Sequence, residues 1–265
     1  MRPSAALTFE LSRLELDVLW EHLRLGPYPT VFRLMGHGRT AAERSRLVEQ
    51  AWRSLQAKGL GPRGAPNALL ADLLRVLSRP EFEVDARMNH GDRVVRALAG
   101  AHGGLAAIGV LTGGLFQFSE ITPGGLSRAA VGLLPEHLAG EGTSVTMPSV
   151  LFSAACAAAG NEPERLRPAL TRRGVRSEDA GQVAEALTGI TGAGQFGAAS
   201  QDRWGRRVRA ANVVGFVDSA AGRFLLTARA PAPNAPPWTT IAPTDPARLT
   251  GQIDRLLAET ARFPP

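Results

Sequence analysis

The stretch that most constrains the fold runs from Arg203 to Arg229, RWGRRVRAANVVGFVDSAAGRFLLTAR. Apolar side chains alternate along its first part and recur in its second part, a pattern typical of two strands. Between them lie Asp218, Ser219 and Gly222, residue types that favour a turn because Asp and Ser bond their own backbone and Gly accepts a positive φ. Because two strands alone are only marginally stable, this hairpin predicts a larger sheet around it.

The first half of the chain supplies helices and then a run of strands. A strand is expected at about 7–10, a helix at 13–24 and a strand at 30–35, followed by helices at 41–58 and 66–77. Ser12 with Glu15, and Thr40 with Glu43, have the spacing of capping boxes. Strands follow at 81–88, 94–101, 105–112 and 115–121. The first of these alternates apolar and charged residues, which predicts one buried face, one wet face and antiparallel pairing.

The second half repeats this succession. We expect a helix at 125–134, a strand at 144–147, helices at 150–159, 162–173 and 178–190, strands at 193–200, 206–217, 223–229 and 238–241, and a last helix at 246–261. Asn161, Ser177 and Asp245 are the expected N-caps, and Pro168 is expected to kink the helix at 162–173. The two runs of strands are offset by about 113 residues. The pattern therefore predicts one α+β domain over 1–265, with quasi-two-fold halves of about 1–122 and 123–265 sharing a central antiparallel sheet.

Composition places the chain among ordinary globular proteins. Of its 265 residues, 44% are hydrophobic and 20% charged, and no apolar run is long enough to cross a bilayer. The N-terminus has no signal-peptide pattern, so a cytoplasmic location is expected, with no membrane insertion. The single cysteine, Cys156, excludes an internal disulfide and lies in an Ala-rich run that favours a buried thiol over a nucleophile.

No motif in the sequence predicts a catalytic centre, a metal site or a cofactor site. Gly192 to Gly197 matches G-x-G-x-x-G, but the match follows a helix and opens a strand, whereas a dinucleotide site needs the reverse order. We interpret these glycines as a corner with room for close packing. The five histidines are scattered without ligand spacing.

Arginine accounts for nearly all of the net charge of +6, with Lys58 the only lysine. The arginines gather at 172–176 and at 203–209, which leaves open an anion or nucleic-acid surface. Acidic neighbours and the scarcity of aromatic residues favour a solvated face or a protein-binding surface instead. We therefore expect no nucleic-acid partner.

Several stretches, taken in order, resemble the EspG family, the cytosolic chaperones of type VII (ESX) secretion in actinobacteria. They are LELDVLWEHLRLGPYPTVFRL at 14–34, TAAER at 40–44, SLQAKGL at 54–60, LSRPEFEVDAR at 77–87, GITGAGQFG at 189–197 and VVGFVDSAAGRFLLT at 213–227. The last is similar to the family's strand, Asp turn and Gly-Arg return. The resemblance covers nearly the whole chain.

The resemblance implies a central antiparallel sheet flanked by two helical bundles, and a role that is not enzymatic. It implies a chaperone that binds the apolar tip of a PE–PPE-like heterodimer, or of another helical ESX substrate, and keeps it soluble for export. The family surface is the central sheet with the C-terminal bundle. By position, this implies Phe196 as an apolar contact and Arg206, Arg209 and Asn212 as polar partners. An ordinary structural role stays open for each of these residues.

Two other classes of function stay open at the level of the sequence. An enzyme with dispersed catalytic residues would show perturbed carboxylates or histidines converging in a deep pocket. A basic nucleic-acid-binding protein would place both arginine groups on one contiguous face, free of carboxylates. The oligomeric state, the identity of the client and the mechanism of its release cannot be read from the sequence.

Overall fold

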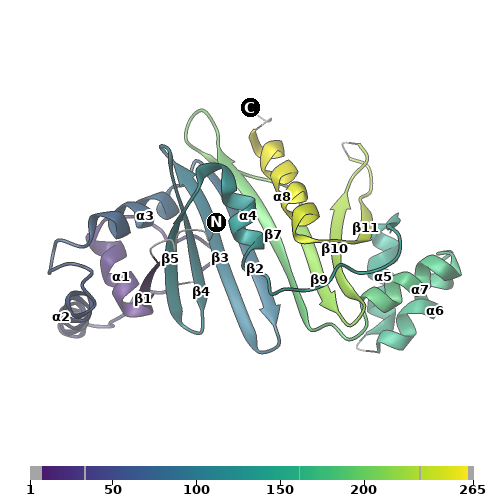
Figure 1. Ribbon diagram of the computed structural model, residues 1–265, viewed down its shortest axis with the longest axis horizontal. Helices are drawn as coiled ribbons and strands as arrows, with labels where there is room; N and C mark the ends of the chain where they lie inside the picture. Colours follow the sequence, from purple (N-terminus) through teal and green to yellow (C-terminus); the bar gives the residue numbers. More distant parts are fainter. Residues whose placement is uncertain (1–7, 33, 161, 233, 262–265) are drawn as a thin grey trace, which may run out of the picture.

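A computed structural model describes residues 8–32, 34–160, 162–232 and 234–261. Within these residues the chain forms eight α-helices and one sheet of eleven strands. Figure 1 shows the sheet extending across the molecule, with a group of helices at each end and further helices lying over its middle. In this part of the chain no helix is long and apolar enough to cross a bilayer.

The same succession occurs twice along the chain: a strand, three helices, a run of strands and a helix. The first succession is β1 (Thr8–Ser12), α1 (Arg13–His22), α2 (Ala41–Ala57), α3 (Ala68–Ser78), β2 (Phe82–His90), β3 (Arg93–His102), β4 (Leu105–Thr112), β5 (Leu115–Ile121) and α4 (Leu126–Val131). The second is β6 (Val145–Pro148), α5 (Ser149–Ala159), α6 (Leu166–Thr171), α7 (Ser177–Ala186), β7 (Gly192–Gln201), β8 (Arg207–Arg209), β9 (Val214–Ser219), β10 (Gly222–Arg229), β11 (Trp238–Pro243) and α8 (Pro246–Ala261).

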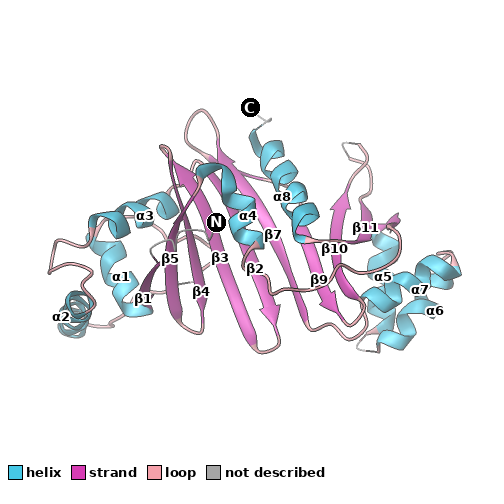
Figure 2. Ribbon diagram, in the orientation of Figure 1, coloured by secondary structure: helices cyan, strands magenta, loops and turns pink. Residues whose placement is uncertain are grey.

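All strand pairs of the sheet are antiparallel, and the order is β1-β5-β4-β3-β2-β7-β9-β10-β11-β6, with β8 beside β7. Figure 2 shows the strands from β1 to β11 side by side in one sheet. The α+β class and the large antiparallel sheet agree with the sequence-based expectation. Outward from the β2–β7 pair, each half has a four-strand meander, then the strand that precedes its three-helix bundle. The order of connection is thus the same in both halves, while an internal two-fold rotation between them stays a prediction.

Side chains on the two faces of the sheet meet different helices, because successive residues of a strand point to opposite sides. On one face, α4 and α8 cover the middle of the sheet, and their apolar side chains pack with the core that contains Val84, Ala86 and Phe196. On the other face, Phe116 and Phe118 pack under α1–α3, and Val217 and Phe224 pack under α5–α7. The two bundles therefore cover the ends of the second face.

The N-terminal bundle is tied together by two buried carboxylates. Ser12 and Glu15 form the predicted capping box, and Glu15 also accepts hydrogen bonds from Ser54 and Lys58. Asp17 accepts from the Tyr28 hydroxyl at 2.9 Å and from the His37 backbone N–H at 2.9 Å. The predicted strand at 30–35 is wrong for its described residues, which form a turn and coil. Val31 and Phe32 are buried in the core, and Asp17 bonds the loop that follows them. The apolar residues here are therefore buried, but they do not pair with a strand.

The C-terminal bundle differs from the expectation in two places. Instead of one helix over 162–173, a 3₁₀ turn (Pro163–Arg165) leads into α6, and Pro168 sits in the first turn of that helix, where its missing N–H breaks no hydrogen bond. Ser177 is the first residue of α7 rather than its N-cap. The proposed cap Asn161 lies outside the described residues. Asp245 accepts from the Arg248 N–H at 2.8 Å, as an N-cap does.

The predicted continuous strand at 206–217 is interrupted. β8 and β9 both pair with the same edge of β7, with Ala199 opposite Arg209 and Phe196 opposite Val214. Residues 197–198 of β7 therefore face the longer segment 210–213, which leaves the ladder as a bulge. The bulge separates two short strands that simple alternation merges into one.

Candidate protein-binding face

The middle of the sheet has one face that no described helix covers. On β2, β7 and β9 the packed helices are α4 and α8, both on the opposite side (Figure 1). We call this uncovered side the open face. Its side chains include Glu83, Asp85 and Arg87 of β2, Arg96 of β3, Gln195 of β7, and Arg207 and Arg209 of β8, assigned from the strand register. The α1–α3 and α5–α7 bundles flank it, so the open face is the floor of a trough.

Two ion pairs cross β7 at one end of the open face. The Arg207 Nε donates to Glu83 at 2.8 Å, and the Arg209 Nη2 donates to Asp85 at 3.2 Å. Glu83 and Asp85 are only 7% and 4% exposed, so the wet face that alternation predicted for β2 is wrong at these two residues. Asp85 raises the pKa of the Arg209 guanidinium, which burial alone would lower. The arginines cover the carboxylates and neutralise this end of the face.

Gly197 makes the second ion pair possible. It lies directly opposite Asp85, and a Cβ at this position would overlap the Arg209 guanidinium. Gly192, at the other end of the G-x-G-x-x-G match, leaves room in the same way for the His90 ring. The glycines thus serve close packing at the start of a strand, as the sequence predicted, and Gly197 lets an arginine from β8 reach β2.

A hydrogen-bonded turn between β7 and β8 lies next to these ion pairs. The Asp202 carboxylate accepts from the backbone N–H groups of Trp204 and Arg206, each at 2.9 Å, and from the Arg206 Nε at 2.9 Å. Trp204 is 55% exposed, with the Arg203 and Arg206 guanidinium carbons 4.0 and 4.8 Å from its ring centre. Tryptophan and arginine held in this way are the residue types that dominate protein interfaces.

The residues predicted to contact a partner lie in different environments. Phe196 is fully buried on the covered face, where it packs in the same core as Leu249 and Ile253 of α8. Its side chain is therefore not accessible to a partner while that core is intact. Arg206 is exposed at the turn, and the Arg209 side chain is 33% exposed on the open face. Asn212 is half-buried in the bulge.

The strand turn that the sequence singled out contains a buried ion pair. The Arg223 Nε and Nη2 donate to the two oxygens of Asp218 at 2.6 and 2.8 Å, and Nη2 also donates to the Pro135 carbonyl at 2.9 Å. Asp218 and Arg223 are each 1% exposed and face each other across the β9–β10 hairpin. Burial lowers the pKa of the adjacent His90, which favours its neutral ring. This network ties the segment after α4 to the hairpin, a structural role.

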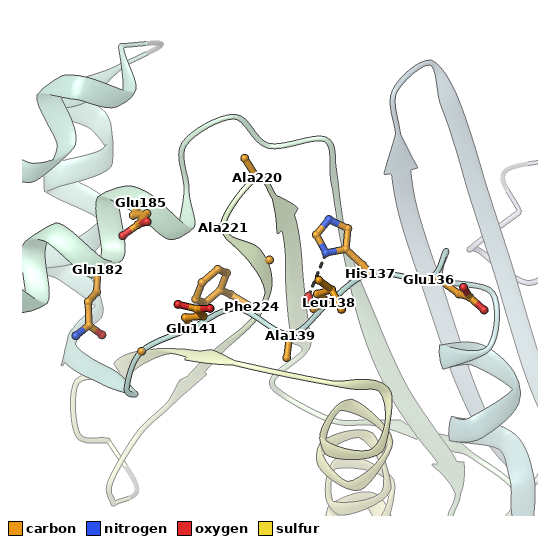
Figure 3. A pocket seen from close by; sticks show the side chains of 12 residues that line it. Glu136, His137, Leu138, Ala139, Glu141, Gln182, Glu185, Ala220, Ala221 and Phe224 are labelled. Carbon is orange, nitrogen blue, oxygen red and sulfur yellow. Dashed lines mark hydrogen bonds between the residues drawn. The ribbon is translucent and has the colours of Figure 1, made fainter.

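A hollow lies away from the open face, between α7, the segment after α4 and the β9–β10 turn (Figure 3). It has a volume of about 960 Å³, and Figure 3 shows Gln182 and Glu185 on one wall and His137 on the other. His137 Nδ1 lies 3.1 Å from the Leu138 carbonyl, and no nucleophile lies beside it among the described residues. No group of three metal-ligating side chains occurs in the described part of the chain. Burial raises the pKa of the Cys156 thiol, which makes it a poor nucleophile.

The arginine groups named above mostly form ion pairs. Arg176 pairs with Asp179, Arg206 with Asp202, Arg207 with Glu83 and Arg209 with Asp85, while Arg173 donates to the Ala169 carbonyl. One group belongs to the C-terminal bundle and the other to the β7–β8 turn. Paired charges spread over two elements argue against a nucleic-acid surface, which needs cations free for phosphates.

Sequence reasoning missed the pairing across β7 and the arginines at the other end of the open face. The sequence does contain a signal for these ion pairs. Two carboxylates, Glu83 and Asp85, stand two residues apart in one half, and two arginines, Arg207 and Arg209, have the same spacing in the other. Recognising it requires knowing that β2 and β8 lie on either side of β7. That adjacency is a property of the topology, which local sequence patterns do not contain.

Both a family sequence model and a solved structure relate this chain to the EspG chaperones. The sequence model of the EspG family matches residues 12–255. The fold is similar to that of the Mycobacterium tuberculosis type VII secretion system chaperone EspG5, solved in complex with a PE25–PPE41 dimer. The TM-score is 0.77 over 96% of each chain, at 14% sequence identity. No curated protein sequence matches the chain.

Proposed function

The chain belongs to the EspG family, the chaperones of type VII (ESX) secretion, and we propose that it binds the apolar tip of a helical PE–PPE-like pair. The family is one of chaperones and not of enzymes. The complex of EspG5 with the PE25–PPE41 dimer supports a partner of this class for a chain of the same fold. An exposed apolar tip aggregates unless a complementary surface covers it, and the chaperone would cover it until export.

The client docks, in this proposal, on the open face and the adjoining C-terminal bundle. The observation that carries the proposal is the uncovered middle of the sheet, flanked on both sides by helices. The bundle adds an apolar surface: on α5, Val150 is 74% exposed, and the exposed alanines are Ala154, Ala157 and Ala158. A trough with a polar floor and an apolar flank fits an amphipathic helical tip.

Among the residues predicted for the partner, the polar ones stay in the proposal. Arg206 and Arg209 are accessible beside the trough, and Asn212 lies in the adjacent bulge. We assign Phe196 a structural role instead, because its ring is buried under α8. Trp204 is the exposed aromatic residue of this region and is the better candidate for an apolar anchor.

We also propose that the chain is one domain built from two halves, about 1–122 and 123–265, related by a quasi-two-fold rotation. The shared order of connection and the β2–β7 pairing at the centre support this. The cytosol is the proposed site of action, since a chaperone of this class must meet its client before export.

The proposal is tested by co-expression with PE–PPE-like or ESX-type gene neighbours, followed by size-exclusion chromatography. We expect a stable complex with a helical pair that precipitates when expressed alone. If every neighbour stays soluble unaided and none co-elutes, the chaperone role for this chain is contradicted.

The position of the site needs its own variant. Gln195 is half-buried in the middle of the open face, so Gln195→Trp should block the trough and abolish co-elution. Gln252→Trp places the same ring on α8, on the opposite side of the sheet, and should leave the complex intact. Normal binding by a folded Gln195→Trp variant would contradict the placement while leaving the chaperone role standing.

A further inference from the structure

We propose that the open face carries a carboxylate-binding site at Arg87 and Arg96, which receives acidic side chains at the tip of the helical client. The inference rests on the proposed function and deepens it, because it states a chemical requirement on the partner. The site lies at the end of the open face opposite the Glu83 and Asp85 ion pairs.

The two arginines face each other on neighbouring strands. Arg87 of β2 lies directly opposite Arg96 of β3, and Gln195 of β7 lies on the other side of Arg87. Both arginines are half-buried. Together with Val94, Asn89 and the start of β7, they line a hollow of about 400 Å³. Both side chains therefore border open space on this face of the sheet.

This arrangement has no internal compensation. Like charges directly opposite each other on a sheet are destabilising, and no ion pair to Arg87 or Arg96 forms within the described residues. The Arg87 Nε is also buried without a hydrogen-bond partner in that part of the chain. A buried, unsatisfied donor on a charged group costs free energy, and such groups are rare in native proteins, so this one calls for a partner outside the chain. The other end of the open face shows the contrast, since Arg207 and Arg209 each have a carboxylate.

The surroundings favour a protein carboxylate over a nucleic acid. A second hollow of about 810 Å³ adjoins the first through Val94 and Arg96, and adds Arg13 and Arg93, with Asp92 as its one acidic residue. Val94 is 50% exposed. Ile190 is 48% exposed and lies close by, because the carbonyl of its neighbour Thr191 accepts from the Gly91 N–H in the β2–β3 turn. No aromatic side chain lines either hollow. Apolar side chains beside unpaired arginines fit an apolar client tip that carries acidic residues, whereas single-stranded nucleic acids need stacking platforms.

The test uses the full chain and the PE–PPE-like pair that co-elutes with it. Arg87→Glu combined with Arg96→Glu should weaken the client affinity at least about tenfold, because both cations become anions facing the client's carboxylates. Arg53→Glu combined with Arg255→Glu makes the same change in net charge on exposed positions of α2 and α8. This control should bind like the wild type. Arg87→Gln with Arg96→Gln serves as a milder variant if the reversed charges impair folding.

Two readouts separate a direct contact from a general charge effect. Changing the acidic residues at the client tip to arginine should restore binding to the Glu variant and weaken binding to the wild type. Arginine modification with phenylglyoxal, followed by mass spectrometry, should show Arg87 and Arg96 protected in the complex and reactive in the free chain.

The outcomes distinguish the inference from the proposed function. If both double variants bind the client as tightly as the wild type does, the carboxylate site is overturned and the chaperone role stays intact. Absence of any wild-type complex removes the proposed function and the inference with it. Binding of a single-stranded oligonucleotide that is lost in the double variants, with client affinity unchanged, would assign the arginines to nucleic acid and contradict the inference.

Discussion

The two faces of β2 and β7 use the same strands for opposite purposes. On the covered face, Val84, Ala86 and Phe196 are fully buried under α4 and α8. On the open face, the alternate residues are charged and reach neighbours across strands. The covered face contributes more to the free energy of folding than the open face does, because burial of apolar side chains dominates stability. The open face instead holds charged side chains, of which the arginines are at least partly accessible, and accessible charges suit recognition of a partner.

The largest effect is expected on the covered face. Phe196→Asp would place a carboxylate without a partner in the core, which destabilises the fold by more than about 4 kcal/mol. We expect loss of the folded state, measured by circular dichroism and urea denaturation. A folded Phe196→Asp variant with a wild-type unfolding midpoint would show that α8 does not bury this ring.

A smaller effect is expected for the ion pairs of the open face. Asp85→Ala removes the partner of Arg209, whose side chain is a third exposed and can turn towards solvent. The expected loss is therefore about 1–2 kcal/mol in urea unfolding, at the lower end for a buried charged partner. Glu49→Ala, which breaks the exposed pair with Arg63, is the matched control and should cost less than about 0.5 kcal/mol.

Gly197→Ala tests how the second pair forms. The new Cβ overlaps the Arg209 guanidinium and comes within 2.8 Å of the Asp85 Oδ2, so the guanidinium must leave Asp85 and the carboxylate must shift. We expect a loss of about 1 kcal/mol, close to that of removing the pair. In a double-mutant cycle, Gly197→Ala should cost little once Arg209 is replaced by Ala. If the losses from Gly197→Ala and Arg209→Ala add up, the glycine is needed for the backbone conformation or packing of β7 and not for the ion pair.

The smallest effect is expected at the unpaired arginines. Arg87→Gln removes one of two like charges and an unsatisfied donor, so the free energy of unfolding should stay unchanged or rise by up to about 0.5 kcal/mol. Urea denaturation measures this, and Arg96→Gln should behave alike. A loss above about 1 kcal/mol would reveal a structural partner for Arg87 and weaken the case for a client carboxylate.

Much of the fold could be predicted from the sequence, because the decisive signals are local. The Ser12–Glu15 capping box, the Asp218 turn and the alternation along β2 each depend on neighbours in the chain. The repeated succession of helices and strands then indicates the shared sheet. These patterns need no knowledge of tertiary contacts.

The site could be predicted only in part, because alternation tells which residues share a face but not which face is covered. Phe196 and Val214 read equally well as an exposed apolar patch or as core, and α8 decides between the two. The bulge at 210–213 depends on two strands sharing one edge of β7. The ion pairs depend on residues that lie far apart in the sequence and meet through the topology.

The central β2–β7 pairing also has a consequence for how the chain folds. Its nine register pairs, from Phe82 opposite Ser200 to His90 opposite Gly192, join residues more than a hundred positions apart. Contacts of such long sequence separation slow folding, because the loop must close before they form. During synthesis, β2 must wait with an unpaired edge until β7 has left the ribosome. This chaperone is therefore itself exposed to aggregation for the time that its second half takes to be made.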